Sequence, residues 1–166
     1  MKTKLIAFLM TGAALMLLGA CTGQKNNAEA DGDEAEVHAP MSVPYSDVEH
    51  YFLKNGAELP ADPKIDTQEQ FDSLFGAAAV MGDDDDLPTR VDFENYFVIA
   101  VALPPTSQDV DLEDRQLLDD GETLTFEYSV DRDDEFRTFE TQPLLLIAVN
   151  RHYERDTVVL SEVTDD

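Results

Sequence analysis

The amino terminus sets how much of this 166-residue chain is available to fold. Lys2 and Lys4 form a short basic start, and residues 5–18 are an apolar run without charge. Gly19 and Ala20 then stand directly before Cys21, which is the only cysteine. A basic start, a short apolar stretch and small residues before a cleavage point are typical of a secretory signal peptide. We therefore predict that residues 1–20 are a signal peptide that takes no part in the fold.

The sequence Leu18, Gly19, Ala20, Cys21 resembles a lipobox, the motif that the lipoprotein signal peptidase recognises. The resemblance implies that Leu18, Gly19 and Ala20 are recognised, that cleavage precedes Cys21, and that the Cys21 thiol carries a diacylglycerol. Two or three acyl chains would hold the protein at a membrane. The alternative is an uncleaved helix over residues 5–24, which is marginally long enough to cross a bilayer. A threonine and glycines inside this stretch weaken that alternative.

Residues 21–40 are predicted to be the lipidated cysteine and a disordered, acidic tether. Residues 22–40 contain almost no large apolar side chain, so burial could not offset the entropy lost on ordering them. The acidic run from Glu29 to Glu34 is similar to signals that send Bacteroidetes lipoproteins to the cell surface. Thr22 differs from the aspartate that resembles an inner-membrane retention signal in enteric bacteria. We expect an outer-membrane lipoprotein, on the periplasmic face or the cell surface.

The charge of the chain excludes some classes of partner. The formal net charge is −25, and without residues 1–20 it becomes −27, from 9 Lys and Arg against 36 Asp and Glu. Binding of nucleic acid phosphates requires clustered Lys and Arg, so no nucleic acid partner is expected. Direct adsorption to anionic lipid is excluded for the same reason. The membrane contact is therefore expected to be the lipid at Cys21 alone.

Residues 41–166 are predicted to form one globular domain. Residues 95–103 and 144–149 are almost entirely apolar and rich in β-branched residues, which is typical of strands buried on both faces. Thr67 and Gln70 form a capping box in front of a short helix with apolar residues at helical spacing. Gly76 is expected to end that helix, as glycine commonly does.

Turn signals divide the rest of the domain. Residues 110–118 and 123–130 are predicted strands joined by a hairpin turn at 119–121, which has an Asp-Gly signature. Residues 131–135 are expected to be a charged loop, residues 136–141 a short strand and residues 157–163 the last strand. Residues 46–55 are expected to be a helical turn running into a strand, with a turn at Asn55-Gly56. The predicted class is α+β, with a mostly antiparallel sheet of five or six strands and one short capped helix.

Chemistry-bearing motifs are missing from the sequence. His38 lies in the tether, and His50 and His152 have no histidine or cysteine at metal-ligand spacing. No nucleophile elbow, phosphate-binding loop or dinucleotide fingerprint is present, so we expect no enzyme activity and no cofactor. The acidic loops could attract a divalent cation, because Ca²⁺ prefers clustered oxygens. The weak metal candidates are Asp83, Asp84, Asp85 and Asp86, with a second acidic cluster at 131–135.

The segments 65–75 and 91–100 together resemble small Bacteroidetes lipoproteins of unassigned function. They are more distantly similar to the carboxy-terminal domain of the lipoprotein subunit of a bacterial surface protease complex. The shared features are a capped helix with Phe71, Leu74 and Phe75, then the pair Asp92-Phe93, then a buried strand. This resemblance covers about residues 65–103 and implies an accessory, protein-binding role in the cell envelope. The alternatives are a small-ligand or divalent-cation-binding module and, third, a hydrolase with dispersed carboxylates.

Overall fold

The computed structural model describes residues 39–78 and 87–164. Within these ranges, strands hold 56% of the residues and there is one α-helix, of seven residues. Four strands form sheet A in the order β1-β7-β8-β10, four form sheet B in the order β2-β9-β6-β4, and β3 pairs with β5. The bounds are β1 Met41–Ser42, β2 Tyr45–Asp47, β3 Tyr51–Leu53, β4 Lys64–Ile65, α1 Gln68–Leu74, β5 Phe75–Ala77, β6 Tyr96–Ala102, β7 Thr106–Asp119, β8 Thr123–Thr141, β9 Leu144–Asn150 and β10 Thr157–Glu162.

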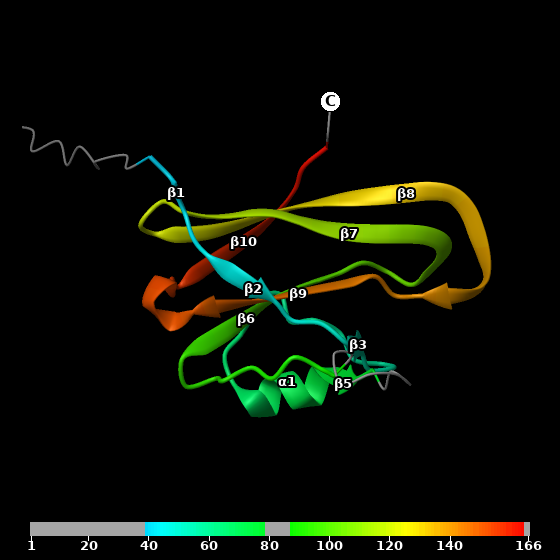
Figure 1. The fold of residues 1–166 in the computed structure, drawn as a ribbon, viewed down its shortest axis with the longest axis horizontal. Helices are drawn as coiled ribbons and strands as arrows, with labels where there is room; N and C mark the ends of the chain where they lie inside the picture. The colour runs from blue at the N-terminus through cyan, green and yellow to red at the C-terminus, as the bar shows by residue number, and fades with distance from the viewer. Residues whose placement is uncertain (1–38, 79–86, 165–166) are drawn as a thin grey trace, which may run out of the picture. The chain divides into compact units, whose positions relative to one another are not determined.

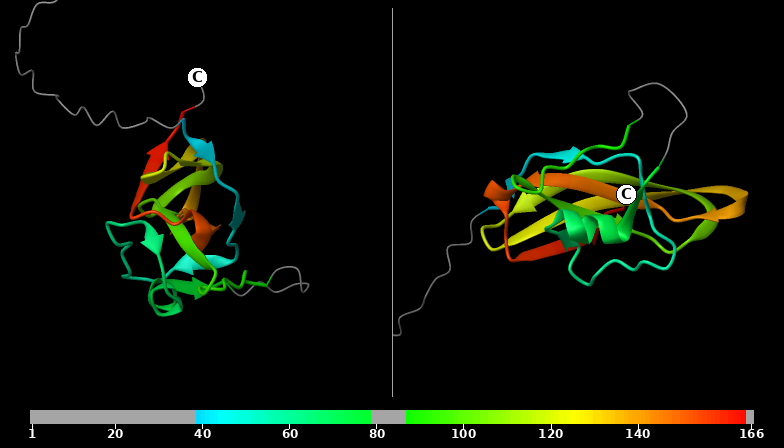
Figure 2. Two further views of the ribbon diagram at one scale, coloured as in Figure 1. Left: turned by 90° about the vertical axis from the view of Figure 1, so that its left-hand side faces the viewer. Right: turned by 90° about the horizontal axis from the view of Figure 1, so that it is seen from below.

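Sheet B is the middle layer of the domain, between sheet A on one face and α1 with β3 and β5 on the other (Figures 1 and 2). Side chains alternate between the two faces of a strand, and β6 shows this directly. Phe97, Ile99 and Val101 enter the core shared with sheet A, whereas Val98 and Ala100 enter the core under α1. The prediction that residues 95–103 and 144–149 are buried strands is therefore confirmed.

The predicted single sheet of five or six strands is wrong in its number of sheets. The strands are mostly antiparallel, as expected, but they divide into two four-stranded sheets and a two-stranded one. The cause is the apolar character of both faces of β6 and β9, because each face needs its own covering layer. The strand β10 also pairs in parallel with β8, which no hairpin connection would give.

The helix α1 begins as predicted and ends differently. The Thr67 side chain accepts a hydrogen bond from the Gln70 N–H, and the Gln70 side chain accepts one from the Asp66 N–H. The helix ends at Leu74, and Phe75 has an extended backbone. Gly76 lies in β5 under the Phe52 ring, and a Cβ placed there would stand 2.5 Å from Phe52 Cζ. The glycine therefore permits close packing and does not cap the helix.

Two other expectations need correction. Residues 131–135 are part of β8 and not a loop, because pairing with β7 at Asp131 and Arg132, and again at Phe136, holds the acidic segment between them in the strand despite its low strand propensity. Residues 46–53 contain no helical turn: β2 pairs with β9, and the positive φ of 65° at His50 separates β2 from β3. The turns at Gly56 and Gly121 are confirmed, with φ of 81° and 97°. No helix among the described residues is long and apolar enough to span a bilayer.

Candidate functional site

The site residues predicted from the sequence lie outside the described part of the chain. These are the predicted recognition and lipidation residues Leu18, Gly19, Ala20 and Cys21, and the metal candidates Asp83, Asp84, Asp85 and Asp86. Lipidation and cation binding at these positions stay predictions. His152 lies on the surface, where its ring makes an edge contact with Tyr153, and His50 lines a pocket between the sheets.

Several of the basic side chains stabilise one end of the fold. Lys64 and Arg151 both form ion pairs with Glu154, at 3.3 and 2.9 Å, and Arg151 also donates to the Asp66 backbone oxygen at 2.6 Å. The pKa of the Glu154 carboxyl is lowered, because hydrogen bonds from Arg151 and Lys64 outweigh the raising effect of its burial. This network joins β4 to the segment after β9.

Arg155 holds the buried end of β7. Its Nε and Nη2 donate to the two carboxylate oxygens of Asp119 at 3.0 and 2.5 Å, and the Asp119 side chain is only 2% exposed. Three of the eight Lys and Arg in the described residues, namely Lys64, Arg151 and Arg155, are thus engaged in internal contacts. Their positive charge is held close to acids of the same chain, so the remaining surface is dominated by carboxylates.

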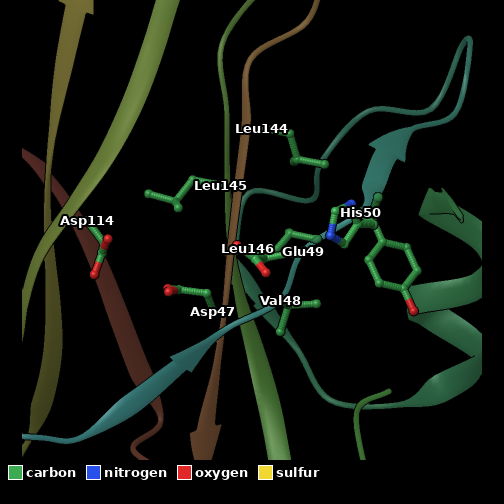
Figure 3. Close-up of a pocket in the computed structure, with 9 residues that line it drawn as sticks. Asp47, Val48, Glu49, His50, Asp114, Leu144, Leu145 and Leu146 are labelled. Atoms are coloured by element: carbon green, nitrogen blue, oxygen red, sulfur yellow. The ribbon is translucent and has the colours of Figure 1, made fainter. Parts of the chain in front are cut away.

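One pocket, here called the acidic pocket, opens between the two sheets. It has a volume of about 370 Å³ and lies where the β2–β3 connection and β9 approach β7. Figure 3 shows the Asp47 carboxylate pointing toward Asp114, with His50 on the other side and leucines of β9 between them. Tyr45 Oη donates to Asp114 Oδ2 at 2.5 Å and so connects β2 in sheet B to β7 in sheet A. The nine lining residues are Asp47, Val48, Glu49, His50, Tyr51, Asp114, Leu144, Leu145 and Leu146.

The electrostatics of the acidic pocket favour a positive charge. Burial is the main cause that raises the pKa of the Asp47 carboxyl, and the negative charges of Asp114 and Glu49 raise it further. Burial and the hydrogen bond to Asp114 raise the pKa of Tyr45, so its phenol stays protonated at neutral pH. No lysine or arginine is among the residues that line the pocket.

The polar side chains that line the acidic pocket are three carboxylates, the His50 imidazole and the Tyr51 phenol. Its lining contains no serine, threonine, cysteine or lysine that could act as a nucleophile. Among residues 39–78 and 87–164, no three His, Cys, Asp or Glu side chains are placed to share a metal ion. The lining can hold an organic cation, because Asp47, Glu49 and Asp114 supply carboxylates and the leucines of β9 supply apolar surface.

A second feature is the end of the β7–β8 ribbon remote from its turn. We call residues 106–112 and 130–141 the arm. Leu112 of β7 and Val130 of β8 are cross-strand partners at the start of the arm, and both pack partly against the core. In Figure 1 the two strands run side by side to the right of the view, where β8 curves back toward β9. Every residue from 131 to 140 is exposed, and Phe136 and Phe139 are 72% and 60% exposed.

The arm is strongly acidic. It holds seven carboxylates and two guanidinium groups, a net charge of −5. Both guanidinium groups have partners, since Arg137 pairs with Asp109 and Arg132 lies 3.8 Å from Glu162. Asp111 and Asp131 stand directly opposite each other in the ladder. Like charges at such positions destabilise a pair of strands, so folding stability does not account for this arrangement.

Sequence reasoning missed both features for different reasons. Asp47 and Asp114 are far apart in the chain, and only the packing of sheet B on sheet A brings them to one pocket. No local pattern signals such a meeting. The arm did carry a signal, because Phe136 and Phe139 stand within an acidic segment that cannot bury them. The sequence predicts a short strand over residues 136–141, and a strand assignment alone does not tell whether these rings are buried or exposed.

Comparisons with protein-family models, with curated proteins and with solved structures find no match to this chain. The resemblance to Bacteroidetes lipoproteins and to a protease-complex subunit therefore stays a prediction.

Proposed function

We propose that this protein is a lipid-anchored, non-enzymatic protein of the bacterial cell envelope whose folded domain binds another protein. The anchor is the lipid at Cys21, and the location is the outer membrane. The observation that carries the binding role is the exposure of Phe136 and Phe139 on the arm, at 72% and 60%.

Two exposed phenylalanines on one strand suit a binding role better than a structural one. Burying an aromatic side chain contributes about 1.5–3 kcal/mol, and this gain is left unused when the ring stays in water. Aromatic side chains also dominate the binding energy at protein interfaces. The rings lie in a segment whose residues are all exposed, so they do not support the core. A partner that covers them would gain the burial energy that folding does not use.

The experiment is crosslinking in living cells with the full lipoprotein, followed by identification of the crosslinked protein. Changing Phe136→Ser together with Phe139→Ser should remove most of the product. The matched control changes Leu87→Ser and Val159→Ser, which are also exposed apolar residues, at 65% and 43%, outside the arm. A partner retained by the arm variant, or lost equally in the control, would contradict the proposed binding role.

The anchor has its own test. Labelling cells with a fatty acid analogue should mark the wild-type chain and should not mark Cys21→Ala. Labelling that persists in Cys21→Ala would remove the lipid anchor from the proposal.

The acidic pocket favours a second candidate function, the binding of a small organic cation. Its supporting observation is that Asp47, Glu49 and Asp114 line one pocket together with leucines of β9 and without a lining lysine or arginine. Calorimetry with spermidine should give heat that disappears in the variant Asp47→Asn with Glu49→Gln. The same titration with Ca²⁺ tests the divalent-cation alternative and the predicted site at Asp83–Asp86. Unchanged heat in the pocket variant would exclude the pocket as the spermidine site.

A further inference from the structure

One edge of β8 is open along the arm. On this edge β10 pairs with Thr123–Tyr128, and the Val163 N–H bonds to the Tyr128 oxygen at 2.8 Å. Within the described residues, no strand pairs with the same edge after Tyr128, although β8 continues to Thr141. An open edge carries backbone donors and acceptors that can pair with a strand from another chain.

Pairing with β7 leaves further backbone groups of β8 outside the ladder. Val110 is paired with Arg132, Gln108 with Phe136 and Thr106 with Thr141. The register therefore skips residues 133–135 and 137–140 of β8, and the Asp133 oxygen accepts a hydrogen bond from the Gln108 side chain. Such irregular positions present backbone groups to solvent. They lie in the same stretch as Phe136 and Phe139.

The side chains along this stretch select the chemistry of the segment that would pair with it. Residues 131–135 contain four carboxylates, and Asp131 faces Asp111 across the ladder. A lysine or arginine placed here would relieve the repulsion between these carboxylates. Phe136 and Phe139 would at the same time contact apolar side chains of the added segment. Acidic and aromatic residues together thus suit a segment in which basic and apolar residues alternate.

We propose that the open edge of β8 over residues 131–141 binds an extended segment of a partner protein, rich in lysine or arginine and interrupted by apolar residues, by strand addition. This inference rests on the protein-binding function proposed above and names the chemistry of its partner. A second copy of the same chain fits this edge poorly, since two arms of net charge −5 repel each other.

The test uses the mature chain, residues 21–166, carrying Cys21→Ser so that no detergent is needed. The probe is a short fluorescent peptide in which lysine and leucine alternate, and fluorescence anisotropy measures its binding. Neutralising the acids of residues 131–135 (Asp131→Asn, Asp133→Asn, Asp134→Asn and Glu135→Gln) should weaken binding by about tenfold or more. Phe136→Ser with Phe139→Ser should weaken it by about tenfold as well.

A matched control separates the arm from the net charge. It neutralises four exposed acids elsewhere (Glu58→Gln, Glu69→Gln, Glu94→Gln and Glu122→Gln), changes the total charge equally and should leave binding within about twofold. Equal weakening by the control would overturn the inference. So would the absence of peptide binding, or a wild-type dimer in sedimentation that involves the arm.

A modified peptide tests strand addition itself. Methylation of alternate backbone nitrogens removes the donors that pair with one strand edge and keeps the side chains, so the methylated peptide should bind at least about tenfold more weakly. Equal affinity of both peptides would overturn strand addition.

The crosslinking assay separates the two proposals. A crosslinked partner that requires Phe136 and Phe139 but tolerates neutralisation of residues 131–135 would overturn this inference and leave the protein-binding function in place. No specific partner for the wild type would overturn the protein-binding function instead.

Discussion

The pair formed by Asp119 and Arg155 gives the sharpest prediction about stability. Asp119 stands at the end of β7, and its side chain accepts two hydrogen bonds from Arg155 and one from the Gly121 N–H at 2.8 Å. Its side chain is 2% exposed, whereas that of Arg155 is 29% exposed. The change Asp119→Ala removes all three acceptor contacts and leaves a guanidinium group without its carboxylate.

The expected cost follows from this geometry. Removing one member of a fully buried ion pair typically costs about 3–5 kcal/mol, because the other charge is left uncompensated. Arg155 is partly exposed and still donates to the Glu154 backbone oxygen at 2.9 Å, so water can solvate part of its charge. We therefore expect Asp119→Ala to lower the free energy of unfolding by about 2–3 kcal/mol. For a domain of this size, the Tm should fall by about 10 °C.

The assay is urea unfolding followed by circular dichroism, with Asp109→Ala as the control. Asp109 also pairs with an arginine, Arg137, but both side chains are partly exposed, at 28% and 41%. The control should therefore cost less than about 1 kcal/mol. The double variant Asp119→Ala with Arg155→Ala should cost less than the sum of the single variants, since neither charge is then left alone. Equal costs for Asp119→Ala and Asp109→Ala, or additive single costs, would refute this reasoning.

Four further outcomes are expected from the same unfolding assay. Phe71→Ala should lower the free energy of unfolding by about 3–5 kcal/mol, because this ring is 2% exposed and contacts three other aromatic rings under sheet B. Thr67→Ala should cost about 1 kcal/mol through loss of the helix cap, and Thr67→Ser should restore most of it. Phe136→Ser should change stability by less than about 0.5 kcal/mol, because the ring is 72% exposed; a larger loss would give it a structural role. The raised pKa of Asp47 means that the folded state binds this proton more tightly than the unfolded state does. The contribution of Asp47 to the free energy of unfolding therefore falls as the pH rises from its unfolded pKa through its folded pKa. Asp47→Asn should therefore be slightly more stable than wild type at pH 7, by less than about 1 kcal/mol, with the difference disappearing near pH 3.

Local sequence signals were sufficient for the elements whose structure depends on neighbouring residues. The cap at Thr67 and the turn at Gly121 are set by hydrogen bonds within a few residues, so the sequence alone places them. The strands β6 and β9 were predicted because an uninterrupted apolar run of six or seven residues must be buried on both faces. These predictions needed no knowledge of what covers each face.

Only the tertiary structure decided how these elements are combined. The division into two sheets, the parallel pairing of β10 with β8 and the meeting of Asp47 with Asp114 all join segments that are distant in the chain. Residues 131–135 have a loop-like composition, yet pairing with β7 on both sides of residues 133–135 makes the whole segment part of a strand. Gly76 has the position of a helix cap, yet the Phe52 ring above it gives the glycine a packing role. Local composition fixes what a segment favours, whereas its final conformation depends on the energy gained from partners that only the folded chain brings together.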